Sequence, residues 1–168
     1  MKSFITLIAF MAIYHCSHSQ TIQDIRDLVF STSFEQIENY LHSNGFHFSN
    51  ASSNTLEDQW WYEKSNNEIK IEMMEVKKDK NDKYAPYILS YISSSEEDFY
   101  RLKKECDTNT AFQKIYEGID EQGNFVRNYC NSIYGCSFMI SSKLVNRTMY
   151  VVTIYNNPDC ALKLKSLK

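Results

Sequence analysis

The chain has 168 residues, enough for one ordinary domain, and 43% hydrophobic with 23% charged residues is a globular composition. Its 4 Gly and 2 Pro exclude collagen-like and proline-rich repeats, which need far more of both. A net charge of −3 argues against nucleic acid or an anionic membrane as the main partner.

Residues 1–19 predict a signal peptide. Lys2 precedes an apolar run from Phe4 to Tyr14, and Ser17 and Ser19 are small residues suited to cleavage before Gln20. The run is shorter than the roughly 20 apolar residues of a membrane span, and no other run approaches that length. We therefore expect a secreted or periplasmic protein with no membrane span. The alternative is a lipid anchor on Cys16, although His15 stands where a small residue is expected.

Two helices and three strands are predicted next. Apolar residues at spacings of three and four favour helices at 21–30 and 33–43, the second ended by Asn44-Gly45. A short apolar segment at 46–48 and a polar stretch at 49–55 follow. After them, alternating and aromatic-rich segments predict strands at 57–64, 68–76 and 87–92. Lys77–Lys83 is interpreted as a charged hairpin loop.

The second half of the chain is predicted to repeat the order of a helix followed by strands. Ser93–Ser95 caps a predicted helix at 96–106, and residues 110–119 fit a helix or a strand equally well. Strands are predicted at 124–130, 134–141 and 148–156.

The two halves, 31–93 and 94–157, match in pattern at an offset of 65 residues, which places Phe34 on Phe99 and Trp60 on Phe125. We expect residues 20–168 to form a single α+β domain, an antiparallel sheet of about six strands with helices packed on one face. A tandem helix-plus-three-strand repeat is one hypothesis, and chance similarity is the other. The layout resembles the β-lactamase-inhibitor-protein and TATA-binding-like folds in element order alone, which implies no site residue.

Four cysteines remain after the leader: Cys106, Cys130, Cys136 and Cys160. An even count in an exported chain favours disulfides, with four free thiols as the alternative. Cys130 and Cys136 flank a predicted hairpin loop and could pair across it, leaving Cys106 for Cys160. Sequence alone does not choose among the three connectivities.

Enzymatic motifs are absent. The sequence contains no GxSxG, HExxH, SxxK, GxGxxG or GxxxxGK, and it lacks the CxxC spacing of a zinc site. We expect no metal and no cofactor. The remaining enzymatic hypothesis is a small exported hydrolase using paired carboxylates, either Glu57 with Asp58 or Glu72 with Glu75.

An antiparallel sheet backed by helices leaves its other face open to solvent. We expect that face to carry some of five aromatic residues of the predicted strands, Trp61, Tyr62, Tyr91, Tyr129 and Tyr150. Such residues are enriched in protein interfaces, and an acidic chain favours a basic partner. The leading hypothesis is a non-enzymatic, inhibitor- or immunity-like binding module for a protein. A lipid-tethered envelope protein with a structural role is a further alternative.

Overall fold

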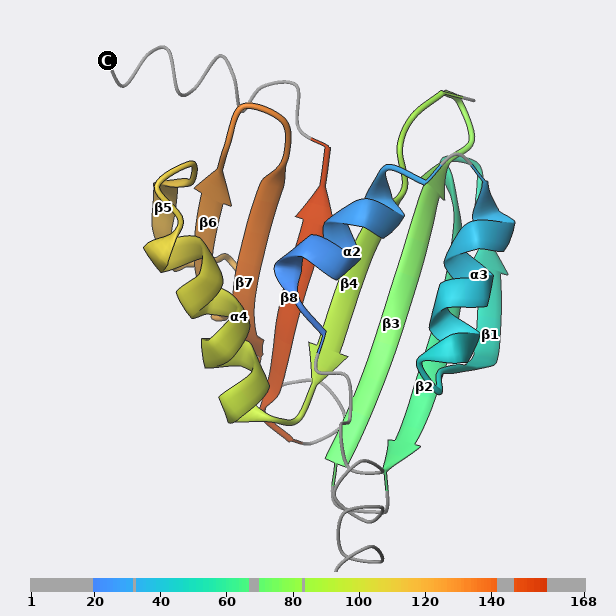
Figure 1. Ribbon diagram of the computed structural model, residues 1–168, viewed down its shortest axis with the longest axis horizontal. Helices are drawn as coiled ribbons and strands as arrows, with labels where there is room; N and C mark the ends of the chain where they lie inside the picture. The colour runs from blue at the N-terminus through green and yellow to red at the C-terminus, as the bar shows by residue number, and fades with distance from the viewer. Residues whose placement is uncertain (1–19, 32, 67–69, 83, 142–146, 157–168) are drawn as a thin grey trace, which may run out of the picture.

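The structure is a computed structural model that describes residues 20–31, 33–66, 70–82, 84–141 and 147–156. Within these residues it contains three helices, α2 (Ile22–Val29), α3 (Phe34–Ser43) and α4 (Glu96–Thr108) (Figure 1). Its strands are β1 (His47–Ser53), β2 (Glu57–Asn66), β3 (Lys70–Asp79), β4 (Ile88–Ser93), β5 (Gln113–Ile119), β6 (Phe125–Cys130), β7 (Gly135–Ser141) and β8 (Met149–Tyr155).

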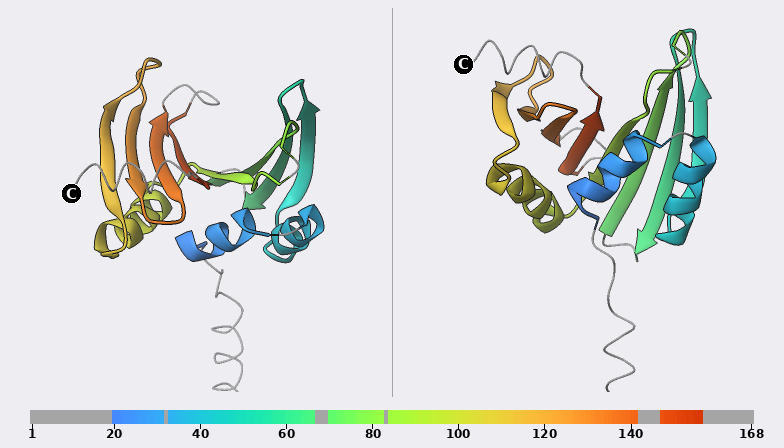
Figure 2. Two further views of the ribbon diagram at one scale, coloured as in Figure 1. Left: turned by 90° about the horizontal axis from the view of Figure 1, so that it is seen from above. Right: turned by 45° about the horizontal axis from the view of Figure 1, so that its top comes forward.

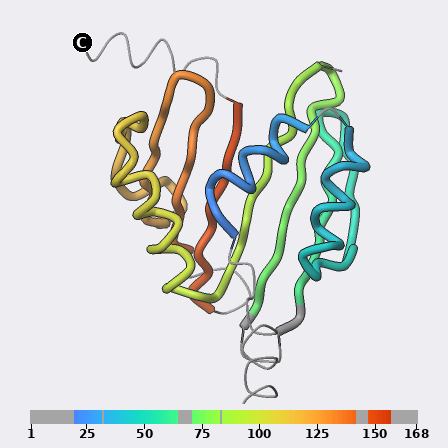
Figure 3. The backbone as a smooth tube through the Cα atoms, viewed as in Figure 1, coloured from blue at the N-terminus to red at the C-terminus, as the bar shows by residue number. Residues whose placement is uncertain are grey.

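All strands belong to one antiparallel eight-stranded sheet in the order β1-β2-β3-β4-β8-β7-β6-β5. The mixed α+β class with a sheet is therefore confirmed, but the expected number of about six strands is wrong. The two additional strands, β1 and β5, form the sheet edges. One helix followed by four strands occurs twice along the chain, with β4 and β8 joined at the centre (Figure 3).

The predicted helices begin and end close to where the structure has them because their caps are local. Thr21 accepts a hydrogen bond from the Asp24 amide, and the Asp24 carboxylate accepts one from the Thr21 amide. Ser33 and Ser95 cap α3 and α4 in the same way, each accepting from an amide three residues on. Gly45 follows α3 with a φ of +81°, a conformation that glycine adopts without strain.

The predicted charged loop at 77–83 begins too early. Strand β3 continues to Asp79, because its last residues pair with the start of β2, Glu57 opposite Asp79 and Gln59 opposite Lys77. Backbone pairing with β2 extends the strand into a segment whose charged side chains had suggested a loop.

The sheet is strongly curved, and the helices lie on its convex side (Figure 2). The main core fills the space between these two layers. Phe99 of α4 packs edge-on against Phe138 of β7, with ring centroids 5.6 Å apart, and both side chains are buried. Within the described residues, no helix is both long and apolar enough to cross a membrane.

Candidate functional site: the concave face of the sheet

The concave side of the sheet bears no helix among the described residues (Figure 2). Side chains alternate between the two faces of a strand, so the register identifies those on this side. Tyr62 and Met74 are opposed and belong to the helix-covered core. Their neighbours Glu63 and Met73 therefore point to the concave side.

One row of directly opposed residues crosses all eight strands on this side. It consists, from β1 to β5 across the sheet, of His47, Glu63, Met73, Ile92, Val151, Met139, Val126 and Gly118. The five residues from Met73 to Val126 are apolar. Ile92 and Val151 are buried among their neighbours, whereas Met73, Met139 and Val126 are half-buried. We call these five residues the apolar row.

The adjacent row is polar in the middle and aromatic towards both ends. It consists of Asn50, Trp61, Glu75, Ser90, Thr153, Ser137, Asn128 and Tyr116. The hydroxyls of Ser90 and Thr153 lie 3.0 Å apart in a hydrogen bond. Oδ1 of Asn128 is a buried acceptor with no donor in the described part of the chain. We call Glu75, Ser90, Thr153, Ser137 and Asn128 the polar row.

The concave side of β2 and β3 is acidic. Glu57 and Asp79 are opposed at one end of this strand pair, and Glu63 and Glu75 lie on the same face. Lys77 is the one cation that β3 places among them in the described residues, and its ammonium lies 3.2 Å from Glu75. Among the described residues of β2 and β3, the concave side therefore carries more negative than positive side chains, and these lie beside the apolar row.

Of the five aromatic residues expected on the open face, the structure places Trp61 there, half-buried beside Met73. Tyr62, Tyr91 and Tyr129 are instead buried beneath the helices, and Tyr150 is half-buried on the same side against Phe99. Their expected exposure is wrong. Trp61 and Tyr62 are consecutive in one strand, so their side chains point to opposite faces.

The hydroxyls of the buried tyrosines bind carboxylates, within the sheet at Tyr91 and between the sheet and α4 at Tyr129. Tyr129 donates to Asp107 of α4, and Tyr91 donates to Oε1 of Glu72 over 3.2 Å. Burial, together with the hydrogen bond to Asp107, raises the pKa of Tyr129 to about 12. These hydroxyls stay protonated and act as structural donors, because a buried phenol needs a hydrogen-bond partner.

The cysteines are arranged differently from the favoured pairing. Cys130 is opposite Gly135, and Tyr129 is opposite Cys136, so Cys130 faces the concave side while Cys136 faces the helices. A bridge between them is incompatible with this register. Cys136 instead meets Cys106 of α4, and the hydrogen bond between the two buried thiols raises the pKa of Cys136. Cys106 and Cys136 are free thiols, Cys130 is not among the free ones, and Cys160 lies outside the described residues.

The structure separates the carboxylates that had suggested a hydrolase. Glu72 lies on the helix side, within 3.8 Å of the Lys64 ammonium, whereas Glu75 lies on the concave side. Glu57 and Asp58 are consecutive strand residues and likewise point to opposite faces. Across the described residues, no three His, Cys, Asp or Glu side chains gather as metal ligands would.

Sequence reasoning missed most of the concave face. Met73 had been placed on one face of an alternating strand, but Val126, Met139 and Tyr116 carried no prediction of their own. The signal was present in the alternation of β6 and β7, and the pairing of strands distant in sequence brings these residues into one row. No family model matches the chain, and neither a curated protein nor a solved structure matches it.

Proposed function

We propose that this chain is an exported binding protein that presents the concave face of its sheet to a basic protein partner, in an inhibitor- or immunity-like role. The observation that carries the proposal is the pair of rows across the helix-free side of the sheet. The apolar row is buried at Ile92 and Val151 and half-buried at its other three positions. Next to the polar row, these half-buried side chains offer a partner a surface to bury and hydrogen-bonding groups that fix its orientation.

Three further features support a protein as the partner. Trp61 and Tyr116 flank the polar row at its two ends, and large aromatic residues often dominate the energy of protein interfaces. The carboxylates on β2 and β3 would steer a basic surface towards this side. The Oδ1 of Asn128 has no donor among the described residues, and a bound partner or a water molecule would supply one.

Export brings the thiols into an oxidising compartment, and we propose that Cys106 and Cys136 form a disulfide there. The two thiols lose two protons and two electrons to a disulfide of an oxidising partner protein, which becomes a dithiol. We propose that the remaining two cysteines, Cys130 and Cys160, form a second disulfide. Both bridges tie chain segments to the second half of the sheet.

We also propose that the chain contains a tandem repeat of one helix and four strands. The first unit runs from α3 to β4, and the second runs from α4 to β8. The central pairing of β4 with β8 would then join two equivalent strands. Such a pairing gives each unit the extended sheet that it needs to bury its apolar side.

The binding proposal is tested by capture with matched variants. Two variants alter the concave side, Trp61→Ala and Glu63→Lys. Their controls make the matching changes at exposed positions on α4: Tyr100→Ala removes an aromatic ring, and Glu97→Lys reverses a charge. We expect a protein recovered from the exported fraction of the source cells with the wild type and both α4 variants, and roughly tenfold less with each concave variant. Equal recovery with all four variants would refute the proposal, as would recovery of no protein by the wild type.

Export is tested by the intact mass of the protein after secretion by its source cell. A chain beginning at Gln20 supports the proposal. A chain that begins at Cys16 and carries diacylglycerol would place the protein on a membrane surface instead. A full-length, unprocessed chain would contradict export.

A further inference from the structure

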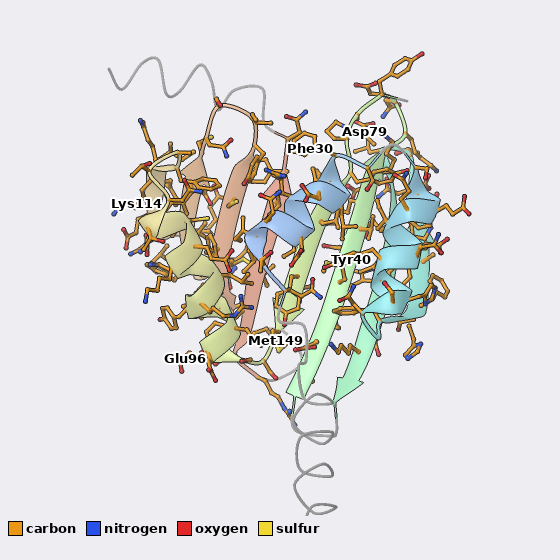
Figure 4. All side chains as sticks on the ribbon, viewed as in Figure 1. Phe30, Tyr40, Asp79, Glu96, Lys114 and Met149 are labelled. Atoms are coloured by element: carbon orange, nitrogen blue, oxygen red, sulfur yellow. The ribbon has the colours of Figure 1, made fainter. Side chains whose placement is uncertain are left out.

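A pocket of about 450 Å³ opens on the helix side of the sheet, away from the concave face. Its walls are the end of α2 with Phe30 (Figure 4), the segment 84–87 before β4, and Asn156 after β8. Its size falls within the range of roughly 300–1,000 Å³ that is typical of pockets for small molecules.

The wall formed by residues 84–87 is held in place by local hydrogen bonds and ring contacts. The Tyr84 amide donates to the Asp82 carboxylate over 2.8 Å, and the Ala85 amide donates to the Asp82 carbonyl over 3.1 Å. The Tyr87 ring lies 6.1 Å from that of Phe34 on α3. Local hydrogen bonds therefore hold residues 84 and 85 in a turn, and a ring contact joins Tyr87 to α3.

Lys78 of β3 is the one charged side chain among the described residues that line the pocket. Its ammonium donates to the Ala85 carbonyl and lies 4.8 Å from the centre of the Tyr87 ring. Among the described residues it has no carboxylate within ion-pair distance. Lys64 of β2, Lys77 of β3 and Lys80 just after β3 each have an ammonium within 3.8 Å of a carboxylate.

A half-buried ammonium has three donors, and the Ala85 carbonyl takes one of them. Removing such a charge from water is unfavourable unless an anion or several acceptors replace the water. Phe30 and Tyr87 supply aromatic walls next to this cation, and Ser31 adds a hydroxyl at the edge. The pocket thus combines a site for one negative charge with space for a flat apolar body.

We propose that this pocket binds a small organic anion, an aromatic or aliphatic carboxylate or sulfonate, with its charged group at Lys78. The apolar part of the ligand lies between Phe30 and Tyr87. The site is independent of the proposed protein-binding face, because the pocket and that face lie on opposite sides of the sheet.

Two dyes of nearly equal shape test the proposal by fluorescence titration: 8-anilinonaphthalene-1-sulfonate, which is anionic, and N-phenyl-1-naphthylamine, which lacks the sulfonate. We expect Lys78→Met to weaken binding of the anionic dye roughly tenfold and to leave binding of the neutral dye unchanged. Lys104→Met, the same change at an exposed position on α4, should alter neither.

A second variant tests the location of the dye. Ser31→Trp fills the pocket and should weaken binding of both dyes, whereas Trp61→Ala on the concave side should weaken neither. Anionic-dye binding that survives both Lys78→Met and Ser31→Trp would overturn the proposal, since the dye would then lie elsewhere. Failure of the wild type to bind the anionic dye would overturn it as well.

Discussion

The hydroxyl of Tyr62 donates a 2.8 Å hydrogen bond to Oε1 of Glu38, which ties strand β2 to helix α3. Tyr129 of β6 and Asp107 of α4 make the corresponding contact in the other half of the molecule. In both cases a fully or almost fully buried ring reaches a carboxylate at the edge of its helix. The helices are therefore attached to the sheet by specific polar contacts as well as by apolar packing.

Tyr62→Phe should lower the free energy of unfolding by about 1–2 kcal/mol, because the ring still fills its site while Glu38 loses a donor. Urea denaturation of the purified protein measures the change. Tyr84→Phe provides the control, since Tyr84 is 90% exposed and should show no change. A Tyr62→Phe variant as stable as the wild type would show that the contact with Glu38 contributes nothing.

Stability should fall at alkaline pH. Burial is the main cause that raises the pKa of Tyr40, Tyr129 and Tyr134 to about 12, above the ordinary value of 10.0. The folded state therefore holds these protons after the unfolded chain has released them, and the free energy of unfolding decreases between about pH 10 and 12. Urea midpoints measured across this range should drop, and drop less in Tyr129→Phe. An unchanged midpoint would contradict the burial of these phenols.

If the chain is exported as proposed, it should contain a reducible cross-link between Cys106 and Cys136. Peptide mapping without reduction should recover the two cysteines in one linked species. The Cys106→Ala/Cys136→Ala double variant should be less stable than the oxidised wild type by about 4 kcal/mol, the value expected for a loop of this length. Recovery of a peptide that links Cys130 to Cys136 would contradict the observed strand register.

Phe99→Ala should be among the most damaging single changes. The ring is 2% exposed and contacts the rings of Phe138, Tyr100 and Tyr150, so its removal leaves a cavity between α4 and the sheet. We expect a loss of about 3–5 kcal/mol in thermal or urea unfolding. Tyr100→Ala, next in the chain but 48% exposed, should cost less than about 1 kcal/mol. Equal effects of the two changes would argue against a core at this position.

Local patterns in the sequence predicted the three helices and the six inner strands. Capping residues such as Thr21 and Ser95 act within three residues of themselves, so they operate before any tertiary contact forms. The inner strands alternate because one of their faces is buried. In β1 every residue is exposed, and β5 is mostly exposed, so neither edge strand displays an apolar face that alternation could reveal.

Tertiary structure alone decided which face of each strand the helices cover. Alternation separates Trp61 from Tyr62 and Cys130 from Cys136, but it does not tell which member of a pair points to the core. That choice depends on the pairing of β4 with β8 and on the packing of α2 and α4 against these two strands, contacts between residues far apart in the chain. The apolar row, the Cys106–Cys136 contact and the pocket at Lys78 all depend on such contacts, and so no local pattern could have predicted them.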